Sequence, residues 1–325
     1  MSAPPPGANR SSAWDSAYHA PVLAPEIVGV VQGARRVLDG TLGGGGHALA
    51  MLESGVEVVI GLDRDPDALV AARARLRRFE TQGRFHTYLG NYAALDQIPE
   101  LAGECFNAIL LDLGISSHQI DDADRGFTFR EDAPLDMRMG GGVGGDATAA
   151  ELLNSIDEQS LAAIFREYGD ERRAHRLARE IVRRRATQPF SVSDDLVRAI
   201  RGALGPRTGP SDFARLFQAV RIAVNDELTG LERALPALRD RLCPGGVLAV
   251  IAYHSGEDRL VKQAFREWSS DCVCPPKQII CTCRGRRLGE LVGKKPLTAS
   301  PEELRGNPRA RSARLRSFRL APAAG

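Results

Sequence analysis

The sequence predicts an α/β protein: a doubly wound, Rossmann-like parallel sheet with an inserted all-helical domain. Two observations carry this prediction. Four short apolar segments alternate with helix-like segments over residues 35–111, and residues 117–210 then show amphipathic helical patterns without a convincing strand. Alternating strand and helix signals of this length favour parallel strands joined by crossover helices. A later apolar run, Val247–Tyr253, returns the chain to the sheet as a fifth strand.

The first half of the sheet is expected to alternate regularly between strands and helices. The expected strands are Arg35–Leu38, Val56–Leu62, Phe85–Leu89 and Phe106–Leu111. The expected helices are Pro25–Gln32, His47–Glu53, Tyr92–Leu101 and a longer one that begins at Asp65-Pro66-Asp67. That tripeptide supplies an Asp N-cap, a proline at the first helical position and an acid in the first turn, which together favour a helix start.

The second half is predicted to be helical before the sheet resumes. Helices are expected at Ala149–Asn154, Glu158–Tyr168, Glu171–Arg185, Asp194–Leu204, Phe213–Leu242 and Asp258–Trp268. Gln278–Cys281 and Leu315–Leu320 are expected to close the sheet as an antiparallel pair. The predicted organisation is therefore a disordered leader at residues 1–18, a discontinuous sheet domain at residues 19–116 and 213–325, and a helical insertion at residues 117–212.

Composition limits the class of protein. The chain has 325 residues, of which 43% are hydrophobic and 26% charged, a profile typical of a soluble globular protein. No apolar run approaches the ~20 residues that a membrane span needs. The first dozen residues are rich in Pro, Ser and Gly and lack the apolar core of a signal peptide. We therefore expect a cytoplasmic protein without a membrane partner; the sequence leaves the oligomeric state open, a homodimer included.

Charge is unevenly distributed along the chain. The net charge is +2, but Arg284–Arg319 contains eleven Lys and Arg against three Glu. A second basic run lies within Arg172–Arg185. Two basic surfaces on a nearly neutral protein indicate a polyanionic partner. The alternative for either run is a solvated helix face.

Four of the six cysteines fall in one short window, at Cys272, Cys274, Cys281 and Cys283. Structural zinc sites usually show C-x₂₋₄-C pairs, so the two C-x-C pairs are an off-pattern match. Disulfides are disfavoured in the cytoplasm. We therefore expect a reduced structural cluster and no metal, with zinc as the alternative.

A glycine-rich turn, Asp39-Gly-Thr-Leu-Gly-Gly-Gly-Gly-His47, follows the first strand. Such a turn lets a ligand approach the backbone and directs free N–H groups at it. Nicotinamide and flavin proteins use G-x-G-x-x-G at this place, but the spacing here does not give that pattern cleanly. Asp39 can meet a positively charged amino group, and Asp63 at the end of the second strand can accept both ribose hydroxyls. These features favour S-adenosylmethionine as the ligand.

Polar residues also follow the fourth and fifth strands. Asp112 ends the fourth strand, and Tyr253, His254 and Ser255 follow the fifth. Ligands of doubly wound sheets bind beyond the carboxyl ends of strands. Asp112 can accept a hydrogen bond from an exocyclic amine, which favours its nucleophilic form, or it can hold the cofactor. The aromatic ring, imidazole and hydroxyl can stack on and bond a base, although an ordinary buried histidine explains His254 nearly as well.

Several long motifs give the chain a family resemblance. They are DGTLGGGGHA, LDRDPDAL, LLDLGISSHQIDDADRGFTF, PLDMRM, FQAVRIAVNDEL, YHSGEDR and NPRARSARLR, in this order. They resemble the motifs of the RsmH (MraW) family of bacterial 16S ribosomal RNA (cytosine-N4)-methyltransferases, from His19 to Arg316. The resemblance implies a class I methyltransferase sheet, a helical domain that recognises substrate, and S-adenosylmethionine as the methyl donor. It implies a decoding-centre cytosine of 16S RNA, within the small ribosomal subunit, as the acceptor.

Site residues follow from the strand ends and the C-terminal basic run described above and, motif by motif, from the resemblance. The cofactor would be bound by Asp39, Gly45, Gly46, His47, Asp63, Tyr92, Asp112 and Gln119. Asp112 would be the catalytic residue. The acceptor side would comprise Ser116, Arg138, Tyr253, His254, Ser255, Arg309 and Arg311. Two positions depart from the family pattern: His118 replaces the usual proline of DLGxSSPQ, and Gly256 replaces the leucine of FHSLEDR, which weakens a role for His254.

Three other functions remain as alternatives. A nicotinamide-dependent oxidoreductase is disfavoured by the glycine spacing and by the antiparallel end of the predicted sheet. A non-catalytic ribosome-assembly factor is disfavoured because the glycines, Asp39 and Asp63 are all present. A methyltransferase for another RNA, DNA or a protein is disfavoured only by the family motifs.

Overall fold

The computed structural model describes residue 14, residues 21–143 and 145–275, residue 278 and residues 280–323. These residues form two compact units. Unit 1 contains the chain up to Gly114 and from Gly230 onward, and unit 2 contains Ile115–Thr229. The leader predicted at residues 1–18 lies outside the described residues, apart from the buried Trp14. In the described part of the chain, no helix is long and apolar enough to cross a membrane.

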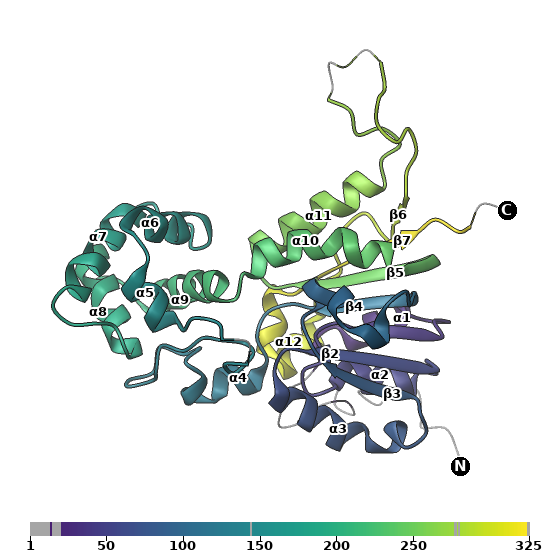
Figure 1. Cartoon of the computed structure of the whole chain (residues 1–325), viewed down its shortest axis with the longest axis horizontal. Coiled ribbons are helices and arrows are strands. Elements are labelled where there is room, and N and C mark those ends of the chain that lie inside the picture. The colour runs from purple at the N-terminus through teal and green to yellow at the C-terminus, as the bar shows by residue number, and fades with distance from the viewer. Residues whose placement is uncertain (1–13, 15–20, 144, 276–277, 279, 324–325) are drawn as a thin grey trace. The chain divides into compact units, whose positions relative to one another are not determined.

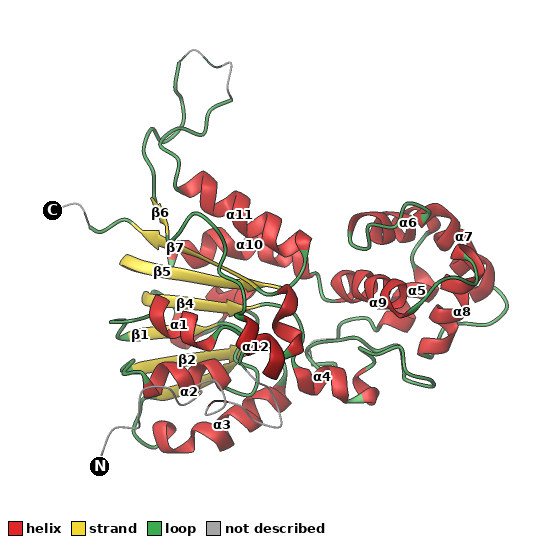
Figure 2. Ribbon diagram, turned by 180° about the vertical axis from the view of Figure 1, so that it is seen from behind, coloured by secondary structure: helices red, strands yellow, loops and turns green. Residues whose placement is uncertain are grey.

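Unit 1 is built on a sheet to which seven strands of the described residues contribute, in the order β3-β2-β1-β4-β5-β7-β6 (Figures 1 and 2). The strands are β1 (Arg36–Asp39), β2 (Val58–Asp63), β3 (Phe85–Leu89), β4 (Phe106–Asp112), β5 (Leu242–Ala252), β6 (Gly289–Leu291) and β7 (Arg314–Leu320). Strands β1 to β5 pair in parallel, whereas β7 is antiparallel to β5 and β6. The strand order reverses between β1 and β4, where doubly wound sheets bind ligands.

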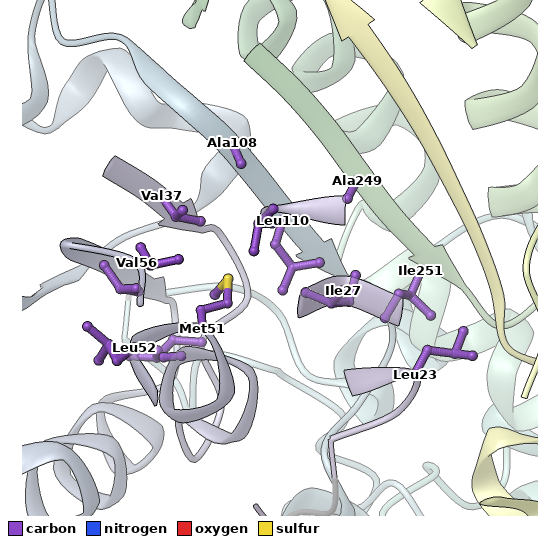
Figure 3. Close-up of a cluster of buried hydrophobic side chains, with 14 of the residues drawn as sticks. Leu23, Ile27, Val37, Met51, Leu52, Val56, Ala108, Leu110, Ala249 and Ile251 are labelled. Atoms are coloured by element: carbon purple, nitrogen blue, oxygen red, sulfur yellow. The ribbon is translucent and has the colours of Figure 1, made fainter. Parts of the chain in front are cut away.

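Helices cover both faces of this sheet and bury its apolar side chains. On one face, α1 (Ala24–Val30), α2 (Gly46–Glu53) and α3 (Pro66–Glu80) pack against the central strands. Figure 3 shows Ile27 and Met51 of these helices beside Leu110 of β4. On the other face lie α10 (Glu227–Asp240), α11 (Ser255–Trp268) and the 3₁₀ helices η2 (Tyr92–Gln97) and η3 (Pro99–Leu101). The chain between β6 and β7 contributes α12 (Pro301–Gly306) and η5 (Pro308–Ser312).

The predicted strands of the parallel sheet are confirmed, but three other expectations are wrong. Residues 92–101 form two 3₁₀ helices because Ala94 and Ile98 leave helical geometry. Residues 213–242 form two helices, since Asp226 adopts a positive φ of 50° between them. The segment that pairs with β7 is Gly289–Leu291, not Gln278–Cys281. Hydrogen bonds from Leu288 to the Trp268 carbonyl and from Ala321 to the Leu288 carbonyl fix that register.

Unit 2 is helical and has a core of its own. It contains α4 (Ser117–Asp121), η4 (Ala123–Arg125), α5 (Ala149–Ser155), α6 (Glu158–Glu167), α7 (Ala174–Arg185), α8 (Ser193–Leu204) and α9 (Pro210–Val224). Phe213 and Phe217 of α9 are buried in the same cluster as Phe165 and Leu177. Helix α9, which the sequence analysis placed in the sheet domain, therefore packs with the helical unit, and unit 2 extends to Thr229.

A disulfide joins Cys105 and Cys243, two residues that the sequence analysis did not single out. Cys105 immediately precedes β4, and Cys243 is the second residue of β5. The parallel pairing of Phe106 with Leu242 brings the two Cα atoms to 5.1 Å. The pair is far apart in sequence, so only the sheet register reveals it.

The position of the glycine-rich turn depends on Gly61 of β2. A Cβ added at Gly61 would lie 2.6 Å from Cδ2 of Leu42, which is buried in the turn. We expect Gly61→Ala to displace Leu42 and to destabilise the protein by about 1–3 kcal/mol, because the core cannot accept the extra volume. Thermal unfolding measures the effect.

The matched control is Gly29→Ala in α1, where an added Cβ meets nothing within 4 Å. Alanine should stabilise that helix by about 0.5–1 kcal/mol. If the two variants unfolded at the same temperature, close packing of Leu42 on Gly61 would be contradicted.

Candidate functional site

Three aspartates gather at the carboxyl edge of the central sheet. Asp39, Asp63 and Asp112 are the last residues of β1, β2 and β4. The parallel register places Asp39 beside Gly61 and Leu110 of the two neighbouring strands. Because parallel strands end at one edge, the sheet concentrates negative charge at the switch point between β1 and β4.

The glycine-rich turn crosses this edge and begins α2. Gly40 donates its N–H to the Leu110 carbonyl at 2.9 Å, and Leu42 donates to the Leu62 carbonyl at 2.8 Å. Gly45 is the N-cap of α2 with φ of 75°, and a Cβ there would lie 2.9 Å from Cδ1 of Leu76. Glycine is required at this position both by the left-handed conformation and by the close packing. No side chain caps α2, so its first N–H groups face the edge of the sheet.

Asp63 binds the turn through backbone donors. Its Oδ2 accepts the Gly43 N–H at 2.8 Å and its Oδ1 accepts the Asp65 N–H at 2.9 Å. Burial raises the pKa of the Asp63 carboxyl to about 6, although these N–H groups act in the opposite direction. Each carboxylate oxygen has a second acceptor position, which leaves Asp63 able to bind further hydroxyl groups.

Asp39 is the most deeply buried acid of the site, with 1% of its surface exposed. Its Oδ1 accepts the Thr41 N–H at 3.3 Å, but its Oδ2 is buried without a hydrogen-bond partner among the described residues. Burial raises the pKa of Asp39 to about 7, and the nearby charges of Asp112 and Asp63 act in the same direction; His47 and Thr41 partly offset them. A buried acceptor without a donor is costly.

Asp112 is the centre of a hydrogen-bonded group of three side chains. Its Oδ2 lies 3.2 Å from His47 Nε2, and its Oδ1 accepts the Tyr253 hydroxyl at 2.8 Å. Its backbone N–H donates to Thr41 Oγ1 at 2.6 Å. Burial and the Asp112 charge raise the pKa of Tyr253 well above its ordinary value, so the phenol stays protonated and donates.

The acids around His47 favour its protonated form. Burial alone would lower its pKa, but the hydrogen bond and charge of Asp112, together with the charge of Asp39, raise it. The second ring nitrogen, Nδ1, is buried without a hydrogen-bond partner in the described part of the chain. His47 was predicted to bind the cofactor; its contact with Asp112 was not predicted, because the two residues are 65 positions apart.

These residues fit a ligand with a cationic amino end and a pair of hydroxyl groups. The unpartnered Oδ2 of Asp39 can accept from an ammonium group, and Asp63 and the uncapped start of α2 line the same edge. Tyr92, which begins η2, is half-buried. It packs against the apolar cluster on the face of the sheet that α10 and α11 cover. The predicted set of Asp39, Gly45, Gly46, His47, Asp63, Tyr92 and Asp112 therefore lies within unit 1.

The segment after β5 forms a helix cap. His254 is the N-cap of α11, and its Nδ1 accepts the Glu257 N–H at 3.5 Å. Glu257 in turn accepts the Tyr253 N–H at 2.8 Å. The imidazole Nε2 lies 3.2 Å from Glu257 Oε1. His254 thus has a structural role that accounts for its position, whereas Ser255 is exposed on the first turn of α11.

Three predicted site residues, Ser116, Gln119 and Arg138, lie in unit 2. Ser116 and Gln119 form a capping box at the start of α4, and Gln119 also donates to the Met139 carbonyl. Arg138 binds Asp136 through its guanidinium, with Nη2 to Oδ2 at 2.6 Å. Sequence reasoning missed Asn225, which is buried and bonds the Met137 carbonyl and the Met139 N–H at 2.8 Å each. This clamp holds PLDMRM in place.

The two basic runs differ in the structure. In the second run, Arg183 and Arg184 bind Glu180, and Arg185 binds the carbonyls of Leu153 and Ile156. That run is therefore largely occupied by contacts within unit 2. In the C-terminal run, Arg309 and Arg311 are exposed on η5, whereas Arg314 and Arg316 bind Asp258.

Comparisons with known proteins agree with the resemblance inferred from the motifs. The sequence pattern of the MraW methylase family matches residues 16–321. A protein of Gemmatimonas aurantiaca named "Ribosomal RNA small subunit methyltransferase H" is 64% identical over 94% of this chain and 96% of its own. Proteins of the same name from Heliobacterium mobile and Heliobacterium modesticaldum are 46% and 47% identical, each over 92% of this chain and 97% of their own.

Asp39 should lower the stability of the ligand-free protein at neutral pH. Because its pKa rises from 3.8 to about 7 on folding, the folded chain binds this proton more tightly than the unfolded chain. The resulting loss of stability grows between those two pH values and is at most about 4 kcal/mol. We expect Asp39→Asn to be more stable than the native protein at pH 8 by roughly 1–4 kcal/mol, and to differ little at pH 4.

Urea unfolding at several pH values measures this difference, without added ligand. The control is Glu100→Gln, at an exposed acid of η3. A stability difference for Asp39→Asn that did not change between pH 4 and pH 8 would contradict the raised pKa.

Proposed function

Because this chain belongs to the MraW methylase family, we propose that it transfers a methyl group from S-adenosylmethionine to the exocyclic N4 amine of a cytosine in the decoding centre of 16S ribosomal RNA, within the small ribosomal subunit. The observation that carries the proposal is the buried, unpartnered Oδ2 of Asp39 beside the carboxylates of Asp63 and Asp112. The names of the relatives support a small-subunit RNA as the acceptor.

The cofactor pocket follows from the donors and acceptors at the sheet edge. Asp39 binds the amino group of the donor, which removes its uncompensated burial. Asp63 accepts hydrogen bonds from the ribose hydroxyls of the donor. The backbone of Gly45 and Gly46, at the start of α2, binds the carboxylate of the donor, and Tyr92 lies at its adenine. S-adenosylmethionine supplies an electrophilic methyl group on a positively charged sulfur. Negative residues around this edge therefore favour the bound cation.

Asp112 prepares the acceptor amine. The lone pair of a cytosine N4 amine is delocalised into the ring, so the free amine is a weak nucleophile. A hydrogen bond from the amine to Asp112 favours its pyramidal form and holds the nitrogen in line for transfer. Tyr253 and His47 already bind the two oxygens of Asp112, and each oxygen has a second acceptor position. The two neighbours therefore orient the carboxylate.

A basic groove on unit 1 supports an RNA substrate. It has a volume of about 330 Å³ and lies between α11, the residues after β6, and β7. Lys262, Arg266, Lys294 and Lys295 line it and are exposed; none of the four forms an ion pair with a described residue. Exposed cations along a groove bind the phosphates of a nucleic acid. We assign this groove, with Arg309 and Arg311, to the RNA backbone.

Ser116, Arg138, Tyr253 and Ser255 complete the proposed acceptor side. Arg138 has a fixed guanidinium plane because Asp136 binds it, and such a plane can stack on a base or bind a phosphate. The helical unit carries Ser116 and Arg138, so its proposed role is recognition of the acceptor. His254 acts through the cap of α11 and positions Tyr253.

The function is tested by methyl transfer from labelled donor to small subunits that lack the modification. We expect label in 16S RNA, at N4-methylcytidine after digestion to nucleosides. Asp112→Ala should give no transfer, and Asp96→Ala, an exposed acid of η2, should transfer normally. Label in another nucleoside, in DNA or in protein would contradict the assigned acceptor. Ribosome binding without transfer would identify an assembly factor.

The basic groove is tested by the salt dependence of RNA binding. Lys294→Ala with Lys295→Ala should weaken binding and reduce the slope of log affinity against log salt by about 1.5, as expected for two lost phosphate contacts. The matched control is Arg77→Ala with Arg78→Ala, two adjacent exposed residues on α3, which packs on β3 at the other edge of the sheet. If both variants changed the slope equally, the effect would come from net charge alone, and the groove would be excluded as the RNA-binding surface.

A further inference from the structure

The four cysteines of the C-terminal half converge in one loop. Cys272, Cys274, Cys281 and Cys283 lie between α11 and β6, in a loop that extends away from the sheet (Figures 1 and 2). A hydrogen bond from the Leu288 N–H to the Trp268 carbonyl, 2.8 Å long, closes the base of the loop. The proposed methyl transfer and the sheet edge do not involve these residues.

The sulfur atoms surround a common point. Cys281 Sγ lies 3.8 Å from Cys272 Sγ, 3.8 Å from Cys274 Sγ and 3.4 Å from Cys283 Sγ. Cys272 Sγ and Cys283 Sγ are also 3.8 Å apart, and all four sulfur atoms lie within 4.8 Å of one another. A disulfide requires about 2.05 Å, so the four residues are separate thiols.

These separations match a tetrahedron of thiolates around one metal ion. With Zn–S bonds of about 2.3 Å, the sulfur atoms at the corners of a regular tetrahedron are about 3.8 Å apart. Four of the six separations are 3.4–3.8 Å. A cluster of several iron atoms would hold its cysteines farther apart than 4.8 Å, because the ions occupy the centre. The geometry therefore fits a single ion.

The chemistry of the ligands selects the ion. Four thiolates in tetrahedral geometry favour zinc, and hard cations such as Mg²⁺ and Ca²⁺ favour oxygen ligands instead. A zinc ion with four thiolates carries two net negative charges. Arg284, Arg286 and Arg287 follow the last cysteine in the sequence and add positive charge to the same segment of the chain. The Val273 N–H also points at Cys283 Sγ, at 3.4 Å, as backbone donors around metal-bound thiolates do.

We propose that Cys272, Cys274, Cys281 and Cys283 bind one zinc ion that folds this loop. The expectation of a reduced cluster without metal rested on the C-x-C spacing. In the structure, the two C-x-C pairs lie close together, and each pair supplies two sulfur atoms to the cluster. The described residues of the loop form neither helix nor strand, and Ile280 is 75% exposed. Such a loop has little apolar burial to hold it, so a metal supplies the folding free energy.

The metal content of the full chain tests the proposal. The protein is purified with a reducing agent and without chelator, and its metals are measured by mass spectrometry. We expect one zinc per chain. Cys272→Ser with Cys281→Ser should lose it, whereas Cys105→Ser with Cys243→Ser, which removes the same number of sulfur atoms elsewhere, should retain it. Equal zinc in both double variants would overturn the assignment.

Two further measurements keep the test independent of folding of the variants. Replacing zinc by Co²⁺ in the native sequence should give the visible bands of tetrahedral cobalt and strong thiolate charge-transfer absorption. Removing the ion with a chelator should speed trypsin cleavage at Arg284–Arg287 about tenfold or more, because the loop then opens. Substoichiometric metal after zinc is added to reduced protein, iron in place of zinc, or disulfides among the four residues would overturn the proposal.

Discussion

The site depends on one constraint: five parallel strands end at the same edge, and three of them end in aspartate. Asp39, Asp63 and Asp112 are thereby held close together, and the charges of Asp63 and Asp112 disfavour the charge of the buried Asp39. The fold tolerates this arrangement through a small number of compensating contacts. A backbone N–H group of the glycine-rich turn binds Asp63. His47 lies next to Asp112, and the acids around it raise the pKa of its imidazole. Asp39 Oδ2 is left without a hydrogen-bond partner among the residues that the structure describes.

The unpartnered Oδ2 of Asp39 lowers the stability of the ligand-free protein and is available to bind a cation. A protein selected only for stability would not retain a buried, unpartnered carboxylate oxygen beside two further acids. A ligand with a positive charge removes the same penalty, so part of its binding free energy is already stored in the free protein. The arrangement thus favours a cation over a neutral ligand of similar shape.

The edge with the three aspartates is only part of the molecule. The helical unit has its own apolar core, and Asn225 fixes PLDMRM within it. The loop of four cysteines precedes β6, and residues of the basic groove follow that strand. A metal in the loop would fix a segment that has almost no core to hold it, close in sequence to the residues assigned to RNA. The chain thus combines three parts, each of which is held in place by different interactions.

The sequence alone determined the alternation of strands and helices, the glycine-rich turn and the family, because these depend on local periodicity and on contiguous motifs. It also identified Asp39, His47, Asp63, Asp112 and Tyr253 as candidates, since each directly ends or follows a strand or begins a helix. Only the tertiary structure decided which of them touch: Asp112 binds His47 and Tyr253, which are 65 and 141 positions away. It also decided the break at Asp226, the pairing of β6, the disulfide and the convergence of the four thiols. The pairing of β6 and the disulfide depend on sheet register, which brings together residues that are far apart in the sequence. The four cysteines form a visible cluster in the sequence, but only the closed loop shows that their sulfur atoms converge.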